Sequence, residues 1–190
     1  MGDDEKFKWS DVWSFKTSFW LLTVSCVVTY ASVFPFIQIA SDLVQKKYGF
    51  DEDEAGNLCF IPYWFSAALS PFLGFGLDKF GHRAILISLS SVILIAAFAI
   101  SMNLPSCTDK CYNELGPLCM VGVAYSIYAA AIWGSIPYVV LPHTVGTAFG
   151  LAMAVQNIGL SFAPSIVAYI KDNTKRMYGY YYVEMFFIGV

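Results

Sequence analysis

Long stretches without a charged residue alternate with short polar segments along this chain. Residues 17–41 contain no Asp, Glu, Lys or Arg, and neither do residues 55–77 or 84–108. A fourth such stretch, residues 115–170, is long enough for two bilayer crossings, because one helical crossing needs about 20 apolar residues. The pattern therefore predicts several membrane-spanning segments rather than one soluble domain.

Helices are expected in these stretches. Strands of a membrane barrel alternate in polarity over about ten residues, whereas these stretches are apolar on all sides and over twice as long. Backbone groups find no water in lipid, so a helix must satisfy them internally. Pro142 and His143 divide the longest stretch. The predicted helices cover about residues 17–41, 55–77, 84–102, 115–140, 146–170 and 178–190, the last of them incomplete.

Composition supports an all-α membrane protein. Hydrophobic residues make up 57% of the chain and charged residues 13%, against about 45–50% and about 25% in soluble domains. The net charge of −3 is small and says little about partners. No basic run indicates nucleic acid as a partner.

The two ends of the chain predict that it is part of a longer protein. The last apolar stretch still continues at Val190. Residues 1–16 carry both charge signs and lack the features of a signal peptide. They are expected to form a cytosolic N-terminal segment or a linker between two halves of a larger membrane protein.

The segment "GFGLDKFGHR" is a charged turn between two apolar stretches. Gly74, with Gly76, can let a neighbouring helix approach closely, and Gly81 can take a positive φ. The carboxylate of Asp78 suits a helix N-terminus. Lys79 and Arg83 suit the water interface, where they can contact lipid phosphates or acids.

This turn resembles the loop signature of the major facilitator superfamily, which recurs between the second and third helices of each six-helix half. The resemblance implies that the turn is cytoplasmic and that Gly74, Asp78, Lys79, Gly81 and Arg83 latch one transport conformation. Any short membrane turn can also be rich in glycine and charge, but the helices around this one fit the family.

Four further stretches resemble one branch of the superfamily, the major facilitator superfamily domain-containing protein 1 branch of lysosomal transporters. They are "VFPFI", "GTAFG", "VQNIGL" and "VEMFFI". The resemblance implies helices seven to twelve of a twelve-helix fold, with the amino-terminal half missing. It also implies a lysosomal membrane location, small peptides or amino-acid-like solutes as cargo, and a glycosylated accessory membrane protein.

Orientation rests on this resemblance, because Lys and Arg divide almost evenly between the two sides and the positive-inside rule gives no answer. With the turn in the cytosol, Cys107 and Cys111 face the other side. A disulfide can close there if that side is oxidising, and free thiols are the alternative. A zinc site would need two more ligands nearby, and the sequence offers none.

In the superfamily, the first, second, fourth and fifth helices of each half line the substrate cavity. Tyr30, Phe34 and Gln38 recur every four residues and share a helix face, while Pro35 can break the helix nearby. The amides of Gln156 and Asn157 should face other helices or water. The cavity candidates are Tyr30, Phe34, Gln38, Tyr63, Trp64, Tyr125, Tyr128, Trp133, Gln156 and Asn157. The alternatives are packing or lipid contact for the aromatic residues and interhelical hydrogen bonds for the amides.

The four predicted cavity helices have no Asp, Glu, Lys or Arg at mid-depth. Ion-pair partners for a charged substrate should therefore lie in the missing half. Glu184 is the one acid inside an apolar stretch. It can be a proton or substrate site, but its peripheral helix favours a structural role at the membrane interface.

We interpret the sequence as a fragment of a solute transporter that works by alternating access. The alternative is a non-transporting membrane scaffold or receptor with the same fold. An enzyme is not indicated, because the sequence offers no nucleophile with its base, no metal cluster and no phosphate loop. No cofactor is expected. The partners expected are a small-molecule or small-peptide substrate, the lipid bilayer and the other half.

Overall fold

The computed structural model describes residues 12–13, 15–107 and 109–190, except for the side chains of Asp78, Phe80 and Met177. Most of the expected N-terminal segment, residues 1–16, lies outside this description. The regular structure of the described residues is helical. The elements are α2 (Thr17–Tyr48), α3 (Glu52–Cys59), α4 (Ile61–Phe80), α5 (Arg83–Asn103), α6 (Leu115–Val139), η2 (Pro142–Thr144), α7 (Val145–Asn173), η3 (Arg176–Gly179) and α8 (Tyr180–Gly189).

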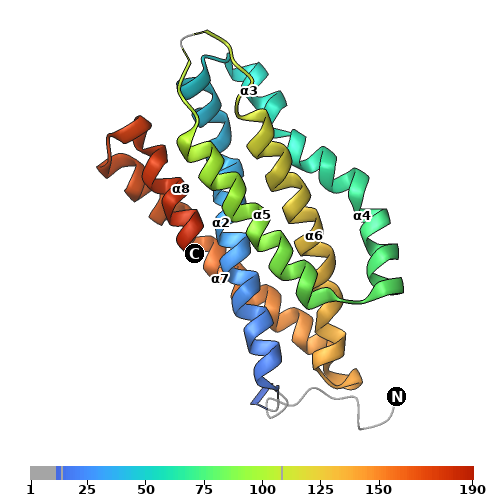
Figure 1. The fold of residues 1–190 in the computed structure, drawn as a ribbon. Coiled ribbons are helices and arrows are strands. Elements are labelled where there is room, and N and C mark those ends of the chain that lie inside the picture. The colour runs from blue at the N-terminus through green and yellow to red at the C-terminus, as the bar shows by residue number, and fades with distance from the viewer. Residues whose placement is uncertain (1–11, 14, 108) are drawn as a thin grey trace.

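The helices run back and forth between two ends of a bundle (Figure 1). The start of α2 lies at one end, together with the α4–α5 and α6–α7 turns. The α2–α3 link and the α5–α6 loop lie at the other end, which we call the disulfide end. Among the described residues, five helical segments are long and apolar enough to cross a membrane, and α8, with 10 residues, is shorter.

Helix α2 differs from its prediction in two ways. It continues beyond residue 41 to Tyr48, and it therefore includes Lys46 and Lys47 in its last turn. It also runs through Pro35, which lies buried inside the helix and does not end it. A proline removes one backbone donor, but packing on several sides holds the helix together in this bundle.

The core lies where α2, α5, α6 and α8 meet, with one contribution from α7. Its buried members include Phe36 of α2, Phe98 of α5 and Phe187 of α8. The rings of Phe36 and Phe98 lie 5.1 Å apart and those of Phe98 and Phe187 5.3 Å apart, as centroids. Lipid tails are as apolar as these side chains, so close packing rather than water exclusion stabilises the contact.

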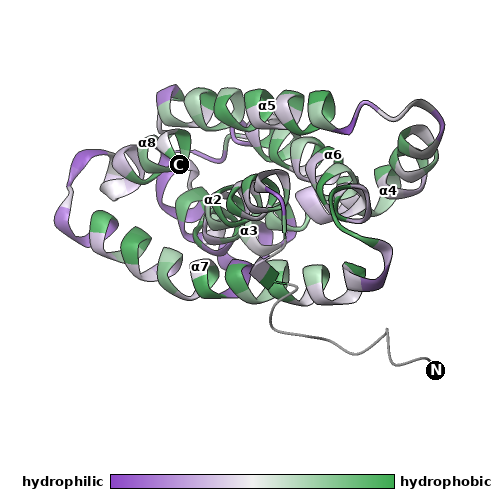
Figure 2. Ribbon diagram, turned by 90° about the horizontal axis from the view of Figure 1, so that it is seen from below, coloured by the Kyte–Doolittle hydropathy of each residue, from purple (hydrophilic) through white to green (hydrophobic). Residues whose placement is uncertain are grey.

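Helix α4 lies at the edge of the bundle and packs mainly on α6 (Figure 2). The two helices approach closely at Gly122, where an added Cβ would come within 2.7 Å of the Cα of Pro62. A small residue is needed at such a crossing. Most of the outer surface of α4 remains uncovered, with Phe72 and Phe75 more than 70% exposed.

The α5–α6 loop at the disulfide end is closed by a disulfide and held against α2 and α3 by polar contacts. Cys107 and Cys111 form a disulfide, and the Cys107 backbone N–H donates to the carbonyl of Lys47 at 2.9 Å. Within the same loop, Lys110 pairs with Glu54 at 2.7 Å and with Asp51 at 3.1 Å. The Glu54 and Asp51 carboxylates raise the pKa of Lys110 above its ordinary value. The loop is thereby held against the end of α2 and the start of α3.

Candidate functional site

Five of the ten cavity candidates lie together between α2 and α6, and we call them the aromatic cluster. Its members are Tyr30, Phe34, Tyr125, Tyr128 and Trp133. Tyr30 lies at the centre, stacked on Phe34 at 5.4 Å and edge-on to Tyr125 at 5.9 Å. The i, i+4 spacing of the α2 residues places them on one face, as the sequence predicts.

Hydrogen bonds engage the polar atoms of Tyr30, Tyr128 and Trp133. The Trp133 indole N–H donates to the Tyr30 hydroxyl at 2.7 Å. The Tyr128 hydroxyl pairs with the Ser25 hydroxyl at 2.9 Å. Tyr128 is fully buried and Tyr30 nearly so. Tyr128 therefore packs inside this half, whereas Phe34, Tyr125 and Trp133 are half-buried and are better placed to contact a bound molecule.

The two amide side chains of α7, those of Gln156 and Asn157, differ in burial. Gln156 is buried, and its Oε1 accepts a weak hydrogen bond from the Cys26 thiol at 3.6 Å. Cys26 packs with the aromatic cluster, so Gln156 adjoins it. Asn157 is exposed. Phe149 stacks on Trp133 at 6.1 Å, and it belongs to this surface although sequence reasoning did not select it.

The remaining candidates lie on exposed surfaces. Gln38 is exposed one turn beyond Phe34. Tyr63 and Trp64 are 44% and 74% exposed on α4 and line an open groove with Phe60. None of the ten candidates carries an ionisable acid or base that is charged at neutral pH. The surface they offer can stack on rings and donate or accept single hydrogen bonds.

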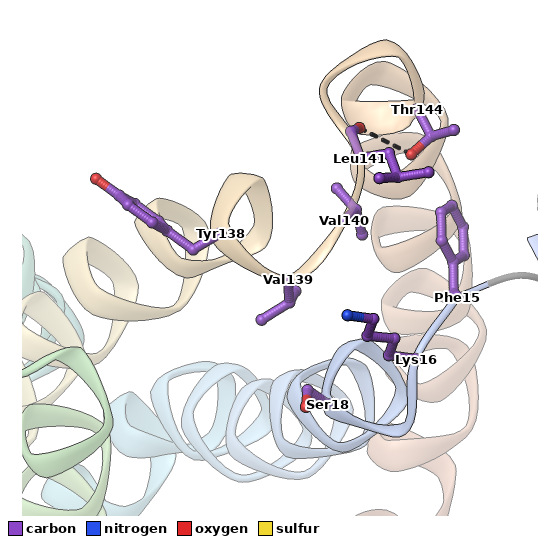
Figure 3. A pocket seen from close by; sticks show the side chains of 8 residues that line it. All are labelled: Phe15, Lys16, Ser18, Tyr138, Val139, Val140, Leu141 and Thr144. Atoms are coloured by element: carbon purple, nitrogen blue, oxygen red, sulfur yellow. Dashed lines mark hydrogen bonds between the residues drawn. The ribbon is translucent and has the colours of Figure 1, made fainter.

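A separate pocket of about 370 Å³ lies at the opposite end from the disulfide (Figure 3). Phe15 and Lys16, before α2, and the α6–α7 turn form its walls. Thr144 donates its hydroxyl to the Leu141 carbonyl at 2.9 Å, which tightens that turn. No cavity candidate from the sequence lies in this pocket.

The glycine-aspartate turn joins the end of α4 to the start of α5. Gly81 has a φ of 68° and ends α4, as expected for a turning glycine. Gly74 and Gly76 face open space among the described residues, because an added Cβ at either would meet nothing within 4 Å. Asp78 lies in the last turn of α4, and its side chain is outside the described part.

The basic residues of the turn contact protein groups. Arg83 Nη1 donates to the carbonyl of Gly134 on α6. Its guanidinium lies 4.6 Å from the ring centre of Tyr138. The Lys79 ammonium lies 6.0 Å from the ring of Phe75. Arg83 therefore ties the start of α5 to the end of α6, a contact that the sequence did not reveal.

A second group of polar residues is buried at the disulfide end, and we call it the buried charge cluster. It consists of Lys47, Tyr48, Ser101, Glu114 and Glu184. Glu184 is fully buried among these residues at the disulfide end. Only Glu184 stood out in the sequence, because the others occur at the ends of apolar stretches where charges are usually exposed.

Comparison with known families decides the class of protein. The model of the Major Facilitator Superfamily matches residues 5–183, which is most of the chain. The chain belongs to this superfamily. The helical bundle of the described residues is therefore part of a major facilitator fold.

Individual members of the superfamily are similar over almost the whole chain. The lysosomal dipeptide transporter MFSD1 of Gallus gallus is 36% identical over 183 residues, 96% of this chain. The proteins of the same name from Homo sapiens and Danio rerio are 33% and 32% identical over 97% of it. The chain spans 38–39% of the length of these three relatives.

Proposed function

We propose that this chain is the carboxy-terminal half of a lysosomal solute transporter that moves small peptides or amino-acid-like solutes by alternating access. Three relatives that match nearly its whole length are named lysosomal dipeptide transporters. The aromatic cluster is the observation that carries the proposal. It places aromatic rings on the first and fourth helices of the half, and the rings of Phe34, Tyr125 and Trp133 are half-buried.

The chemistry of this surface suits part of a peptide rather than the whole of it. Phe34, Tyr125 and Trp133 can pack against a side chain or the flat face of a peptide bond. The charged termini of a dipeptide need ion-pair partners, and the cavity candidates of this half provide none. We therefore place those partners on the amino-terminal half, with the binding site between the two halves.

The proposed orientation puts the Gly81 turn in the cytosol and the disulfide end in the lumen. A disulfide between Cys107 and Cys111 supports this arrangement, because disulfides persist on oxidising sides of membranes. Gly74, Asp78, Lys79, Gly81 and Arg83 would then form the cytosolic latch. A glycosylation acceptor site inserted between Cys107 and Cys111 should become modified in cells, and an unmodified site would contradict the orientation.

We also propose a glycosylated accessory membrane protein as a partner. Purification of the full native protein from lysosomal membranes in mild detergent should recover a second, glycan-bearing subunit in fixed ratio. Recovery of the transporter alone, still active, would contradict this part of the proposal.

Uptake of labelled dipeptides into liposomes that contain the full native protein tests the cargo. We expect saturable uptake that unlabelled dipeptide competes away. Phe34→Ala and Trp133→Ala should raise the KM for uptake several-fold, because each removes a ring that faces the proposed site. Leu89→Ala on the outer face of α5 is the control and should leave uptake unchanged, since Leu89 is 47% exposed and away from the cluster.

Three results would contradict parts of the proposed function. Correctly folded protein that carries no dipeptide in either direction would defeat the proposed cargo. Equal effects of Phe34→Ala and Leu89→Ala would show that the aromatic cluster is packing alone. Normal partner recovery without any flux would favour the membrane scaffold instead.

A further inference from the structure

The buried charge cluster joins four elements at the disulfide end, away from the aromatic cluster. Lys47 and Tyr48 come from the last turn of α2, Ser101 from α5, Glu114 from the residue before α6, and Glu184 from α8. The exposed fractions of Lys47, Glu114 and Glu184 are 1%, 3% and 0%. One basic and two acidic side chains thus share one site that is closed to solvent.

The hydrogen bonds in this site cannot all form if both carboxyl groups are ionised. The Ser101 hydroxyl lies 2.5 Å from Glu114 Oε1 and 2.8 Å from Glu184 Oε1. A serine hydroxyl has a single hydrogen to donate, and an ionised carboxylate can only accept. One of the two carboxyl groups must therefore carry a proton and donate it to Ser101.

The remaining contacts decide which carboxyl group carries it. Glu114 accepts at both oxygens, from Ser101 at Oε1 and from the Tyr48 hydroxyl at Oε2, 2.8 Å away. Two donors stabilise the ionised form, and an O–H donor at 2.5 Å is typical of a charged acceptor. Glu184 Oε2, in contrast, has no hydrogen-bond partner among the described residues. An unpaired oxygen costs less on a neutral acid than on a carboxylate.

The balance of charge in the site also indicates that Glu184 is neutral and Glu114 is ionised. Lys47 donates to the carbonyl of Ser101 at 2.6 Å and is the cation of the site. Its positive charge balances one ionised glutamate, whereas two would leave a buried net negative charge. Such an uncompensated charge is expensive in a low-dielectric interior.

Charged groups on α7 and before α8 contact other partners. Lys171 of α7 and the hydroxyl of Tyr180 both contact Asp42. Arg176, before α8, lies 3.7 Å from the ring centre of Tyr181. The groups that act on Glu184 are Lys47 and Tyr48 from α2, Ser101 from α5 and Glu114 beside α6.

We propose that Glu184 is a proton-binding site, and that its neutral carboxyl group fastens α8 to α2, α5 and α6 through Ser101. On release, the carboxyl O–H bond breaks, the proton passes to water, and a second carboxylate remains beside Glu114. The repulsion between the two carboxylates and the loss of one hydrogen bond loosen α8. The site binds a proton independently of the cargo, so the proposal goes beyond the proposed function.

Infrared difference spectra of the full native protein in lipid nanodiscs test the protonation directly. As the pH rises from about 5 to about 8, the wild type should lose a carbonyl stretching band of a protonated carboxyl group. Glu184→Gln should lack this band. The control Glu54→Gln should keep it, because Glu54 is half-exposed in the same end of the bundle and outside the cluster. Glu114→Gln should shift the loss of the band to lower pH, since Lys47 then has Glu184 as its only anion.

Thermal unfolding across the same pH range provides an independent measurement. The wild-type midpoint should fall by about 2–4 °C between the acid and the alkaline limit. The midpoint of Glu184→Gln should stay flat, because glutamine has the shape of the neutral acid and its amide can donate to Ser101.

Three results would overturn the proposal. The first is a wild-type spectrum without any carboxyl band that depends on Glu184, and the second is a band that Glu184→Gln retains. The third is failure of Glu184→Gln to fold, because a permanently neutral side chain of the same shape should be tolerated if the native group is neutral.

Discussion

The aromatic cluster and the buried charge cluster both place polar atoms inside the bundle. The two clusters differ in the hydrogen-bond partners that these atoms have. At mid-helix, Trp133 and Tyr128 each pair with one uncharged hydroxyl group, that of Tyr30 and that of Ser25 respectively. At the disulfide end, full charges are buried, and Ser101 connects both acids while its carbonyl holds Lys47. Among the described residues, the charges that are fully or almost fully buried gather at the disulfide end, where several helices and the disulfide loop cover them.

The largest effect should come from removing the cation of the charge cluster. Lys47→Met leaves the Glu114 carboxylate without a counter-charge and should cost about 3–5 kcal/mol of stability. Lys47→Met combined with Glu114→Gln should recover most of the loss, because no net charge then remains. Chemical unfolding of the full protein in detergent measures both. A double variant no better than the single one would mean that packing of the lysine stem, and not charge, matters.

The next effect concerns Gly122, which lies on α6 between Glu114 and the aromatic cluster. Gly122→Ala should cost about 1–3 kcal/mol, since the new methyl group meets the backbone of Pro62 and pushes α4 away. Gly116→Ala on the same helix is the matched control, because its added Cβ would meet nothing within 4 Å. Equal unfolding free energies for the two variants would refute the close approach.

A smaller effect is expected in the aromatic cluster. Trp133→Phe and Tyr30→Phe each remove the same hydrogen bond and should each cost about 1 kcal/mol. The double variant should cost little more than either single variant, because the bond can be lost only once. Additive losses in the unfolding cycle would show that the two groups do not interact, and would weaken the contrast with the charge cluster.

The smallest effect should come from the exposed pair of Lys110 and Glu54. The pKa of Lys110 is raised in the folded protein. The ion pair therefore stabilises the fold below the ordinary lysine pKa, and this stabilisation is lost as the pH rises through the raised value. Glu54→Gln should lower the pKa of Lys110, as measured by NMR of labelled lysine, with little change in unfolding. A large loss of stability would show that this surface pair matters as much as the buried cluster.

Much of the fold could be predicted from the sequence because hydropathy is a local property. The absence of charge over residues 17–41 or 115–170 predicts helices in lipid wherever those helices later pack. The aromatic spacing on α2 and α6 likewise predicted shared faces, and five of the ten cavity candidates do lie together. The end of α2 was less predictable, because its last turn contains the charged residues Lys46 and Lys47.

The sequence alone could not show which of two neighbouring residues is buried, because that depends on how the helices pack. Gln156 and Asn157 differ by about 100° around α7, and only the position of α2 decides that Gln156 is the buried one. The exposure of Tyr63 and Trp64 follows in the same way from the place of α4 at the edge of the bundle.

The sequence by itself determined that the chain crosses a membrane as helices, that a glycine turns it at residue 81, and which superfamily it resembles. Each of these depends on residues close together in the chain. Only the tertiary structure decided that Lys47, Glu114 and Glu184 share one closed site. Burial and protonation of a charged group depend on which distant groups surround it, and that neighbourhood exists only once α2, α5, α6 and α8 have packed.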